Sequence, residues 1–370
     1  MTADGVGLVR RAFQDTPAEW EQSIRLPRLE LALLTRQLAV MLGAGLSLHR
    51  ALGVLCDSAV DESNAVVLYR IIRGVDAGKK LSAAMSTFPR VFGTVFLAMV
   101  EVGEETGQLV RTLTNLADWL ESEESLIRQI RSAFTYPSIV FGAAAILTVG
   151  FLVAIFPAFS DALQSVDDLP VLTLILIAIS SALRNPLFWM VGFVGLLGGI
   201  HFASRALRAP KNRLAVWKFL TELPMVNQIL RDCSASRFAS AMTILLQTGV
   251  DILKSFHLAS LASGSPLIID QLEEGVVFLS RGGDLAAFMK EHPDAYPSMM
   301  AGLVMVGQES ATLPEVFQKL QRSLNEYTGY RLDILTSLLE PFLIIFVAAL
   351  MVLLLAGVAM PLYDLVNTTL

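Results

Sequence analysis

Apolar residues between residues 29 and 134 recur at spacings of three and four along the chain. This spacing is typical of amphipathic helices, whereas a half-buried strand would alternate with a period of two, which no stretch sustains. Gly45, Gly78 and Gly107 interrupt the pattern, and Ser47 is placed to cap the helix after the first of them. The pattern predicts a bundle of about six helices, and residues 205–338 carry a second pattern of the same kind.

An uncharged apolar stretch follows each of these patterns. Residues 137–159 carry no charge, and Pro341 and Pro361 enclose a similar stretch near the C-terminus. About 20 apolar residues in a helix cross the hydrocarbon core of a bilayer, and a lipid-exposed span must be helical to satisfy its own backbone groups. Residues 185–204 are also uncharged, so three transmembrane helices are predicted.

Both patterns return after a fixed distance. An offset of 204 residues separates Pro137 from Pro341 and Pro157 from Pro361. Matches at helix stops and turns are hard to obtain by chance, so they indicate an internal duplication, which places two related surfaces on one molecule. The same offset relates the pairs Leu42 and Leu246, Gly45 and Gly249, Gly78 and Gly282, Leu81 and Leu285, Met85 and Met289, Pro89 and Pro293, Val102 and Val306, Gly103 and Gly307, Glu105 and Glu309, and Leu109 and Leu313.

The charges at the ends of the uncharged stretches are asymmetric. Arg128 and Arg131 precede the first stretch, and a cluster of basic residues between 205 and 218 follows the second. The opposite ends carry Asp161 and Asp364. Because cytoplasmic flanks are enriched in Lys and Arg, the N-terminus and both bundles are predicted to lie in the cytoplasm.

The predicted fold class is therefore all-α: a polytopic membrane protein with two homologous six-helix cytoplasmic bundles and three transmembrane helices. Residues 169–183 are too few for a comfortable crossing, which favours an interfacial helix there. The predicted segments are 1–28 (N-terminal tail), 29–134 (first cytoplasmic domain), 135–159 (first span), 160–186 (external loop and interfacial helix), 187–204 (second span), 205–338 (second cytoplasmic domain), 339–363 (third span) and 364–370 (C-terminal tail).

Composition agrees with a membrane protein. Of the 370 residues, 54% are hydrophobic and 17% charged, whereas soluble domains are about a quarter charged. The net charge of −6 lacks the basic footprint of a nucleic-acid binder. Cys56 and Cys233 are two isolated thiols, which favours small buried side chains over a disulfide framework or metal cluster. The first 20 residues lack the apolar core of a signal peptide, so the first span is expected to direct insertion.

No catalytic constellation is present in the sequence. Residues 74–82, GVDAGKKLS, miss the spacing of a phosphate-binding loop, and Lys80 stands where Ser or Thr would bind magnesium. The four histidines have no metal-ligand spacing, and the spans lack the interior charges of ion pumps and coupled transporters. Glu340 precedes Pro341, where a carboxylate would suit a helix start. The sequence predicts neither an enzyme nor a cofactor or metal site.

The segment from Gly103 to Leu109, with its duplicate from Gly307 to Leu313, is the most informative motif. The simpler interpretation is a turn in which Thr106 or Ser310 caps the next helix. The alternative is a protein-contact surface, since the motif recurs at the same place in both repeats. The predicted partner-binding residues are Gly103, Glu104, Glu105, Gly107, Gly307 and Glu309.

The motif also contributes to an acidic group. This group could in principle hold a hard cation, although a solvated helix face is the favoured interpretation. Its members are Glu101, Glu104, Glu105, Asp118 and Glu121.

Several segments resemble a known family. They are LTRQLAVMLGAGLSLHRAL (residues 34–52), its echo at residues 237–256, VGEETGQL around Gly103, residues 223–238, and the pairs Tyr136-Pro137 and Glu340-Pro341. Over about residues 30–365 the chain is similar to the inner-membrane platform proteins of type II secretion and type IV pilus assembly (general secretion pathway protein F, pilus assembly protein PilC). Three positions depart from the family turn: Thr106 replaces Ser, Gln308 replaces Glu and Ala311 replaces Gly.

The resemblance implies a non-enzymatic platform in the cell inner membrane that couples a cytoplasmic ATPase to the insertion of pilin-like subunits into a fibre. It also implies contacts with other inner-membrane assembly proteins and with further copies of the chain. A small polytopic transporter or channel is the alternative function, and uncharged spans with much predicted cytoplasmic mass speak against it. The sequence does not separate the secretion system from the pilus system.

Overall fold

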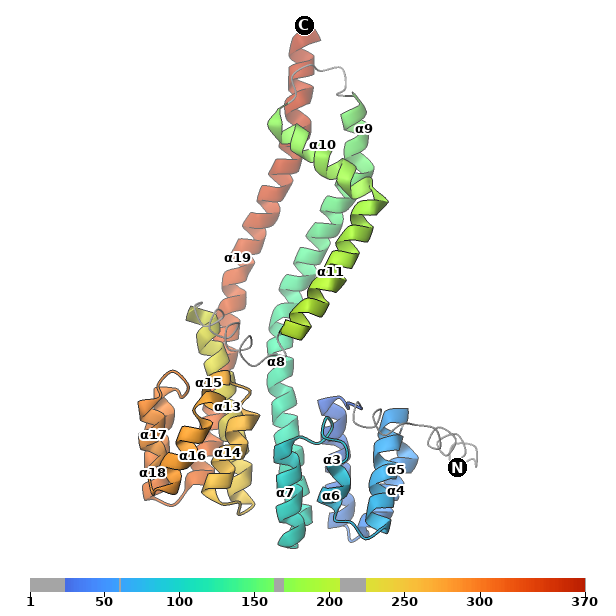
Figure 1. Ribbon diagram of the computed structural model, residues 1–370. Helices are drawn as coiled ribbons and strands as arrows, with labels where there is room; N and C mark the ends of the chain where they lie inside the picture. Colours follow the sequence, from blue (N-terminus) through green and yellow to red (C-terminus); the bar gives the residue numbers. More distant parts are fainter. Residues whose placement is uncertain (1–23, 60, 163–169, 207–223, 370) are drawn as a thin grey trace. The chain divides into compact units, whose positions relative to one another are not determined.

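The computed structural model describes residues 24–59, 61–162, 170–206 and 224–369. All regular elements within these ranges are helices (Figure 1), which confirms that the fold is all-α. The chain divides into two compact units: Met1–Arg128 with Val226–Thr328, and Gln129–Met225 with Gly329–Leu370. Most of the predicted N-terminal tail, residues 1–23, lies outside the described residues.

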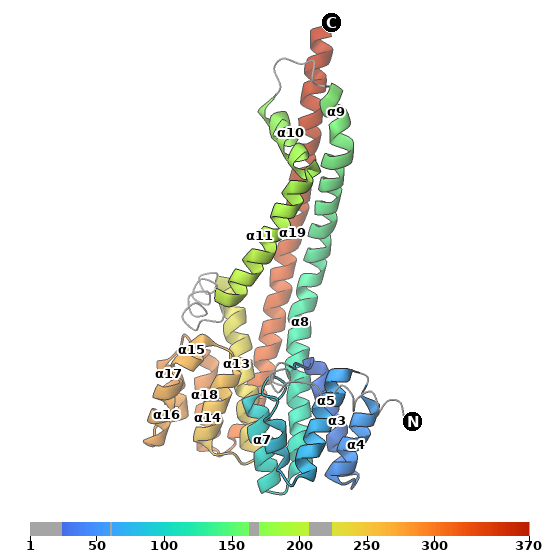
Figure 2. The same cartoon turned by 45° about the vertical axis from the view of Figure 1, so that its right-hand side comes forward.

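The first repeat has the six helices that the sequence predicts. Consecutive helices from α3 to α7 pack side by side, and Figure 2 shows the group from a second direction. Ser47 caps α4 as expected, because its side chain accepts the backbone N–H of Arg50 at 3.4 Å. The helices are α3 (Arg28–Gly43), α4 (Leu48–Ser58), α5 (Glu62–Asp76), α6 (Leu81–Met85), α7 (Thr94–Glu105) and α8 (Leu109–Gly150).

The second repeat follows the first at the predicted offset of 204 residues. Helices α14, α17, α18 and α19 begin at the positions equivalent to the starts of α4, α6, α7 and α8. Helices α15 and α16 together occupy the place of α5, with a break at Gln271. The helices are α13 (Pro224–Gln247), α14 (Ile252–Ala262), α15 (Pro266–Asp270), α16 (Leu272–Ser280), α17 (Leu285–Glu291), α18 (Ser298–Glu309) and α19 (Leu313–Thr369).

Backbone conformation repeats as closely as the helix boundaries. The residues at 45 and 249 have φ angles of 88° and 84°, and those at 78 and 282 have 80° and 84°. These values lie in the left-handed region of backbone conformation, which glycine enters without a steric penalty. A glycine in this conformation commonly ends a helix. All four residues are glycines, so the turns between helices are built alike in both repeats.

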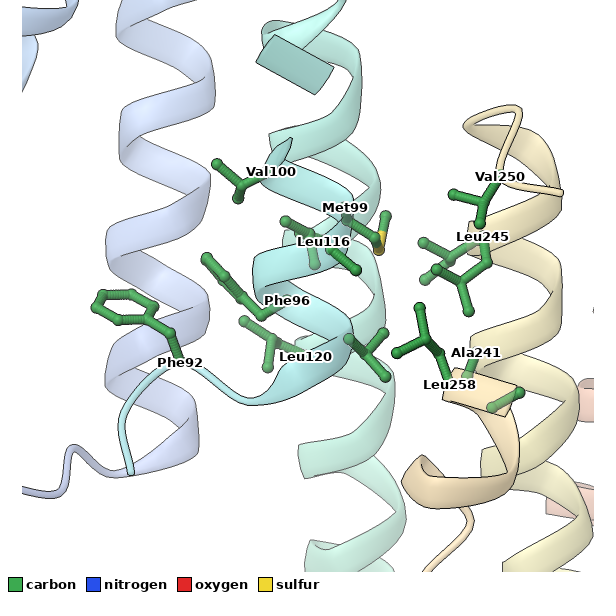
Figure 3. Packing of buried hydrophobic residues seen from close by; sticks show 14 of the residues in the cluster. Phe92, Phe96, Met99, Val100, Leu116, Leu120, Ala241, Leu245, Val250 and Leu258 are labelled. Carbon is green, nitrogen blue, oxygen red and sulfur yellow. The ribbon is translucent and has the colours of Figure 1, made fainter. Parts of the chain in front are cut away.

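One hydrophobic core contains buried residues of both repeats. In the second repeat, the ring of Phe238 lies 5.8 Å from Phe256 and 5.5 Å from Tyr296, both edge-on. Such edge-on pairs add about 1 kcal/mol beyond their buried area. Between the repeats, Met99 of α7 points toward Leu245 and Leu258 (Figure 3). Apolar packing therefore joins the repeats within the first unit.

Within the part of the chain that the structure describes, two helices are long and apolar enough to cross a membrane. They are the continuous helices Leu109–Phe159 and Leu313–Met360. The first contains Pro137 and continues through a π-helical turn, η1 (Phe151–Ile155), into α9 (Phe156–Ala162). Since α19 runs unbroken past residue 341, the prediction that Glu340 stabilises a helix start is wrong.

A third crossing depends on a bent pair of helices. Helix α10 (Val171–Arg184) is followed by α11 (Pro186–Ala206). The pair bends by 79°, and the segments Val171–Arg184 and Pro186–Gly192 have the length and apolarity of a span only together. The second predicted span and the interfacial helix therefore stay predictions.

Helix α10 packs closely within the second unit. It contacts η1, α9 and α11, and Leu176 is buried with Leu354 of α19. Two buried hydroxyls also bond across helices: Thr173 donates to the carbonyl of Gly357 at 3.1 Å, and Ser180 to that of Leu152 at 2.6 Å. Buried polar groups need such partners, so these two hydrogen bonds fix the position of α10 against α19 and η1.

Candidate functional site

The turn that the sequence singles out joins α7 to α8 and α18 to α19. In the first turn the Thr106 hydroxyl donates to the carbonyl of Val102 at 2.8 Å, and in the second Ser310 donates to Val306 at 2.7 Å. An N-cap side chain would instead accept a backbone N–H of the following helix. The prediction that Thr106 or Ser310 caps the next helix is therefore wrong, because both hydroxyls bond back to the preceding helix.

Gly103 and Gly307 have a packing role in these turns. A Cβ atom on Gly103 would lie 2.7 Å from the Thr112 hydroxyl oxygen, and one on Gly307 would lie 2.9 Å from a methyl carbon of Val316. Both distances are shorter than real Cβ contacts. Glycine at these two positions thus lets α7 approach α8, and α18 approach α19.

The Glu104 side chain holds the start of the short helix α6. Its carboxylate accepts the backbone N–H groups of Leu81 and Ser82, the latter at 3.0 Å, and the Ser82 hydroxyl at 2.5 Å. No side chain at the N-cap position of α6 supplies such a bond. Glu104 thus satisfies the helix start from a distant point in the sequence, and its charge suits the positive end of the helix.

Gln308 holds α17 in the same way. Its side-chain oxygen accepts the N–H of Ala286 at 3.0 Å, and Asp284 accepts the same N–H at 2.8 Å. Because an amide oxygen can replace one carboxylate oxygen as acceptor, the structure explains how Gln is accommodated at this position.

The other predicted partner-binding residues differ in exposure. Glu105, Gly107 and Glu309 are exposed, whereas Gly103 and Gly307 are buried. Glu105 forms an ion pair with Lys80 at 3.1 Å, which is a surface pair of small energetic value. Each repeat therefore presents part of its turn on the surface and uses the remainder to pack its own helices.

The acidic group near this turn is divided among separate partners. Arg36 binds both Asp118 at 2.5 Å and Glu121 at 3.0 Å, and these carboxylates raise the pKa of its guanidinium. Glu101 pairs with Lys254 at 3.9 Å. Among the described residues, no three His, Cys, Asp or Glu side chains are grouped as metal ligands. Members of the acidic group therefore form separate ion pairs with basic residues on the helix surfaces.

Glu123 is a buried charged residue that the sequence pattern did not single out. It is buried on α8, 3.2 Å from Arg28 of α3 and 3.4 Å from Arg237 of α13. Burial raises the pKa of this carboxyl, and the two arginines partly oppose that change. Glu123 lies three residues after Leu120, on the apolar stripe of α8 that includes Leu116. A charged residue on this stripe was the signal in the sequence from which its burial could have been predicted.

A cleft of about 530 Å³ opens beside Glu123 in the first unit. Arg25, Arg28 and Arg90 contribute to its wall, and the indole N–H of Trp119, which is also in the wall, has no hydrogen-bond partner among the described residues. The cleft combines positive charge with apolar surface, which suits a protein segment better than a small polar substrate.

Comparison with known proteins gives this arrangement a context. Residues 34–157 and residues 238–361 each match the type II secretion system (T2SS) protein F family. The chain belongs to this family. The two matches begin and end at equivalent positions of the two repeats, so the protein F family domain coincides with the duplicated unit of helical bundle and apolar helix.

Relatives of the protein F family match over nearly the whole chain. The type IV pilus assembly protein PilC of Thermus thermophilus is 30% identical over 94% of this chain and 87% of its own length. TapC, a type IV pilus assembly protein of Aeromonas hydrophila, is 28% identical over 92% and 82%. The type II secretion system protein F of Pseudomonas aeruginosa is 27% identical over 91% and 82%. The family resemblance predicted from the sequence is confirmed.

Proposed function

We propose that the protein is an inner-membrane platform of a type II secretion or type IV pilus assembly machine. The observation that carries this proposal is the pair of protein F family domains, each a helical bundle that leads into an apolar helix. Its relatives carry names from both systems. We propose that it couples a cytoplasmic ATPase to the insertion of pilin-like subunits into a fibre, without catalysis of its own.

The proposed topology has a cytoplasmic N-terminus, three crossings and an external C-terminus. The basic residues beside residues 137–159 and after residue 204, against Asp161 and Asp364 at the opposite ends, support it. Both repeats then face the cytoplasm, where the ATPase is. Residues 187–204, within α11, are the proposed second crossing, and α10 is the proposed interfacial helix. A chain with both repeats on one side of the membrane requires this second crossing.

The exposed parts of the two turns are the proposed contact with the ATPase or another assembly protein. Glu105 and Glu309 occupy equivalent exposed positions next to helix ends. Changing the charge of an exposed interface residue alters association without disturbing the fold. Glu104 is unsuitable for such a test, because its carboxylate holds α6.

Deletion of the gene, followed by measurement of surface fibres and secreted protein, tests the function. Loss of either output, with recovery on complementation, is the expected result. Unchanged outputs would contradict the platform proposal. Reporter fusions after Ala206 and at Asp364 test the topology separately: a periplasm-specific reporter should be active only at the second position, and activity only at the first would reverse the assignment.

A further inference from the structure

The two repeats contact each other through different faces. The α7/α8 face of the first repeat meets the α13/α14 face of the second. Met99 lies toward Leu245 and Leu258 (Figure 3), and the ion pairs of Glu123 with Arg237 and of Glu101 with Lys254 join the same two faces. Arg50 is the equivalent of Lys254, and Met305 is the equivalent of Glu101. If a two-fold axis related the two repeats, the pair of Glu101 with Lys254 would be matched by a contact between Met305 and Arg50. Met305 is instead exposed, so the repeats are joined head to tail.

The α3/α4 face of the first repeat and the α18/α19 face of the second repeat are the equivalents of the two contacting faces, and both expose apolar residues. On the α3/α4 face of the first repeat, Val40 is 63% exposed, whereas its equivalent Ile244 is 7% exposed. On the α18/α19 face of the second repeat, Leu303 is 40% exposed, whereas its equivalent Met99 is fully buried. Further exposed apolar residues on these two open faces are Leu33 and Val54 on the first and Val306 and Tyr327 on the second.

We propose that copies of the protein associate head to tail, with the α18/α19 face of one copy on the α3/α4 face of the next. The structure supports this occupant because the two open faces are the equivalents of two faces that already fit each other within one chain. Exposed apolar groups of this kind mark interaction surfaces. A head-to-tail contact leaves a free face at each end, so further copies can add until a ring closes or a row forms.

The chemistry of the new contact differs from that of the internal one. The ion pair of Glu123 with Arg237 is replaced by Tyr327 opposite Leu33, which is an apolar pair. Arg36 and Gln37 stand where the second repeat buries Ser240 and Ala241, and such polar groups are typical of reversible interfaces. The proposed head-to-tail association is argued from the duplication of the repeat, so it does not depend on the proposed platform function.

Site-directed cross-linking in native membranes tests the proposal. Two differently tagged full-length copies, both C56A/C233A, are co-expressed, one with Arg50→Cys and the other with Met305→Cys, and membranes are treated with a short bismaleimide. A product carrying both tags is expected. The matched control is Glu101→Cys with Lys254→Cys in one chain, the equivalent internal pair, whose side chains approach within 3.9 Å in the structure.

Three results would overturn the proposal. The first is a missing mixed product while the internal control cross-links. The second is a product formed by two Arg50→Cys copies or by two Met305→Cys copies in place of the mixed one, since this means a two-fold contact. The third is an unchanged yield when Val54→Glu or Leu303→Glu is added, because each should lower it severalfold. Val277→Glu, at an exposed apolar position on α16, a helix that belongs to neither face, should leave the yield unchanged.

Discussion

Glu104 and Ser82 are joined by two hydrogen bonds, from the Ser82 backbone N–H at 3.0 Å and from its hydroxyl at 2.5 Å, although they lie on different helices. The carboxylate also accepts the N–H of Leu81. The acidic residue of the turn thus fixes α6 against α7. In the second repeat Gln308 accepts one N–H of α17 with a single oxygen, beside the N-cap residue Asp284, which accepts the same N–H.

Glu104→Ala is expected to lower the free energy of unfolding by about 1–3 kcal/mol, because it leaves a helix start without its acceptor. Glu104→Gln should cost less, since one acceptor oxygen remains. Thermal unfolding of the purified full-length protein, followed by circular dichroism, measures both. Glu105→Ala, at an exposed neighbour, is the control and should change stability by less than about 0.5 kcal/mol. Equal stability of Glu104→Ala and the control would contradict this role.

Gly107 and Ala311 share a left-handed backbone, with φ angles of 68° and 56°. A non-glycine residue there carries a steric penalty of about 1–2 kcal/mol. Gly107→Ala should therefore lower the free energy of unfolding by about 1 kcal/mol, whereas Ala311→Gly should leave it unchanged or raise it. The same unfolding experiment compares them, and a stabilising Gly107→Ala would show that this turn relaxes to another conformation.

Glu123 should give stability a particular dependence on pH. Its pKa is raised by burial, so the folded state binds this proton more tightly than the unfolded state. Its contribution to stability is then largest below the ordinary pKa of glutamate and falls as pH rises through the raised value. Glu123→Gln resembles the protonated side chain at every pH.

The stability of the wild type relative to Glu123→Gln is therefore expected to fall as pH rises through that window. Melting temperatures measured over a pH series give this difference, with Glu105→Gln as the exposed control. A wild type that instead gains on Glu123→Gln with rising pH would mean that Arg28 and Arg237 outweigh burial.

Ser180 and Thr173 are expected to hold α10 in place within the second unit. Ser180→Ala and Thr173→Val each remove one buried hydrogen bond, worth about 0.5–1.5 kcal/mol. Ser181→Ala, whose exposed hydroxyl bonds only within α10, is the control. Melting temperatures lowered by both changes but not by the control are the expected result, and equal effects of all three would contradict the assigned contacts.

Periodicity and turn glycines were sufficient to predict the helices and the duplication. These features depend on neighbouring residues, so a single sequence contains them. The positive φ angles at Gly45 and Gly78 occur where the apolar pattern stops, and Ser47 caps the helix that it precedes. The family resemblance depended on the same segments.

The contacts of individual side chains could not be predicted in this way. Glu104 meets Ser82 only because α6 and α7 pack together, and the burial of Glu123 depends on Arg237 from the other repeat. Thr106 has the residue type of an N-cap but bonds back to Val102, since a hydroxyl serves either helix end. Each contact depends on how helices pair in space.

The proposed function requires the two repeats to bind the ATPase that drives fibre assembly at the membrane. Purification of the tagged full-length protein from solubilised inner membranes, with the secretion or pilus ATPase quantified in the eluate, tests it most directly. We expect the ATPase to co-purify with the wild type, and we expect its amount to be reduced severalfold by Glu105→Lys combined with Glu309→Lys, at unchanged membrane levels. An ATPase absent from the wild-type eluate, while pilin-like subunits are retained, would contradict it.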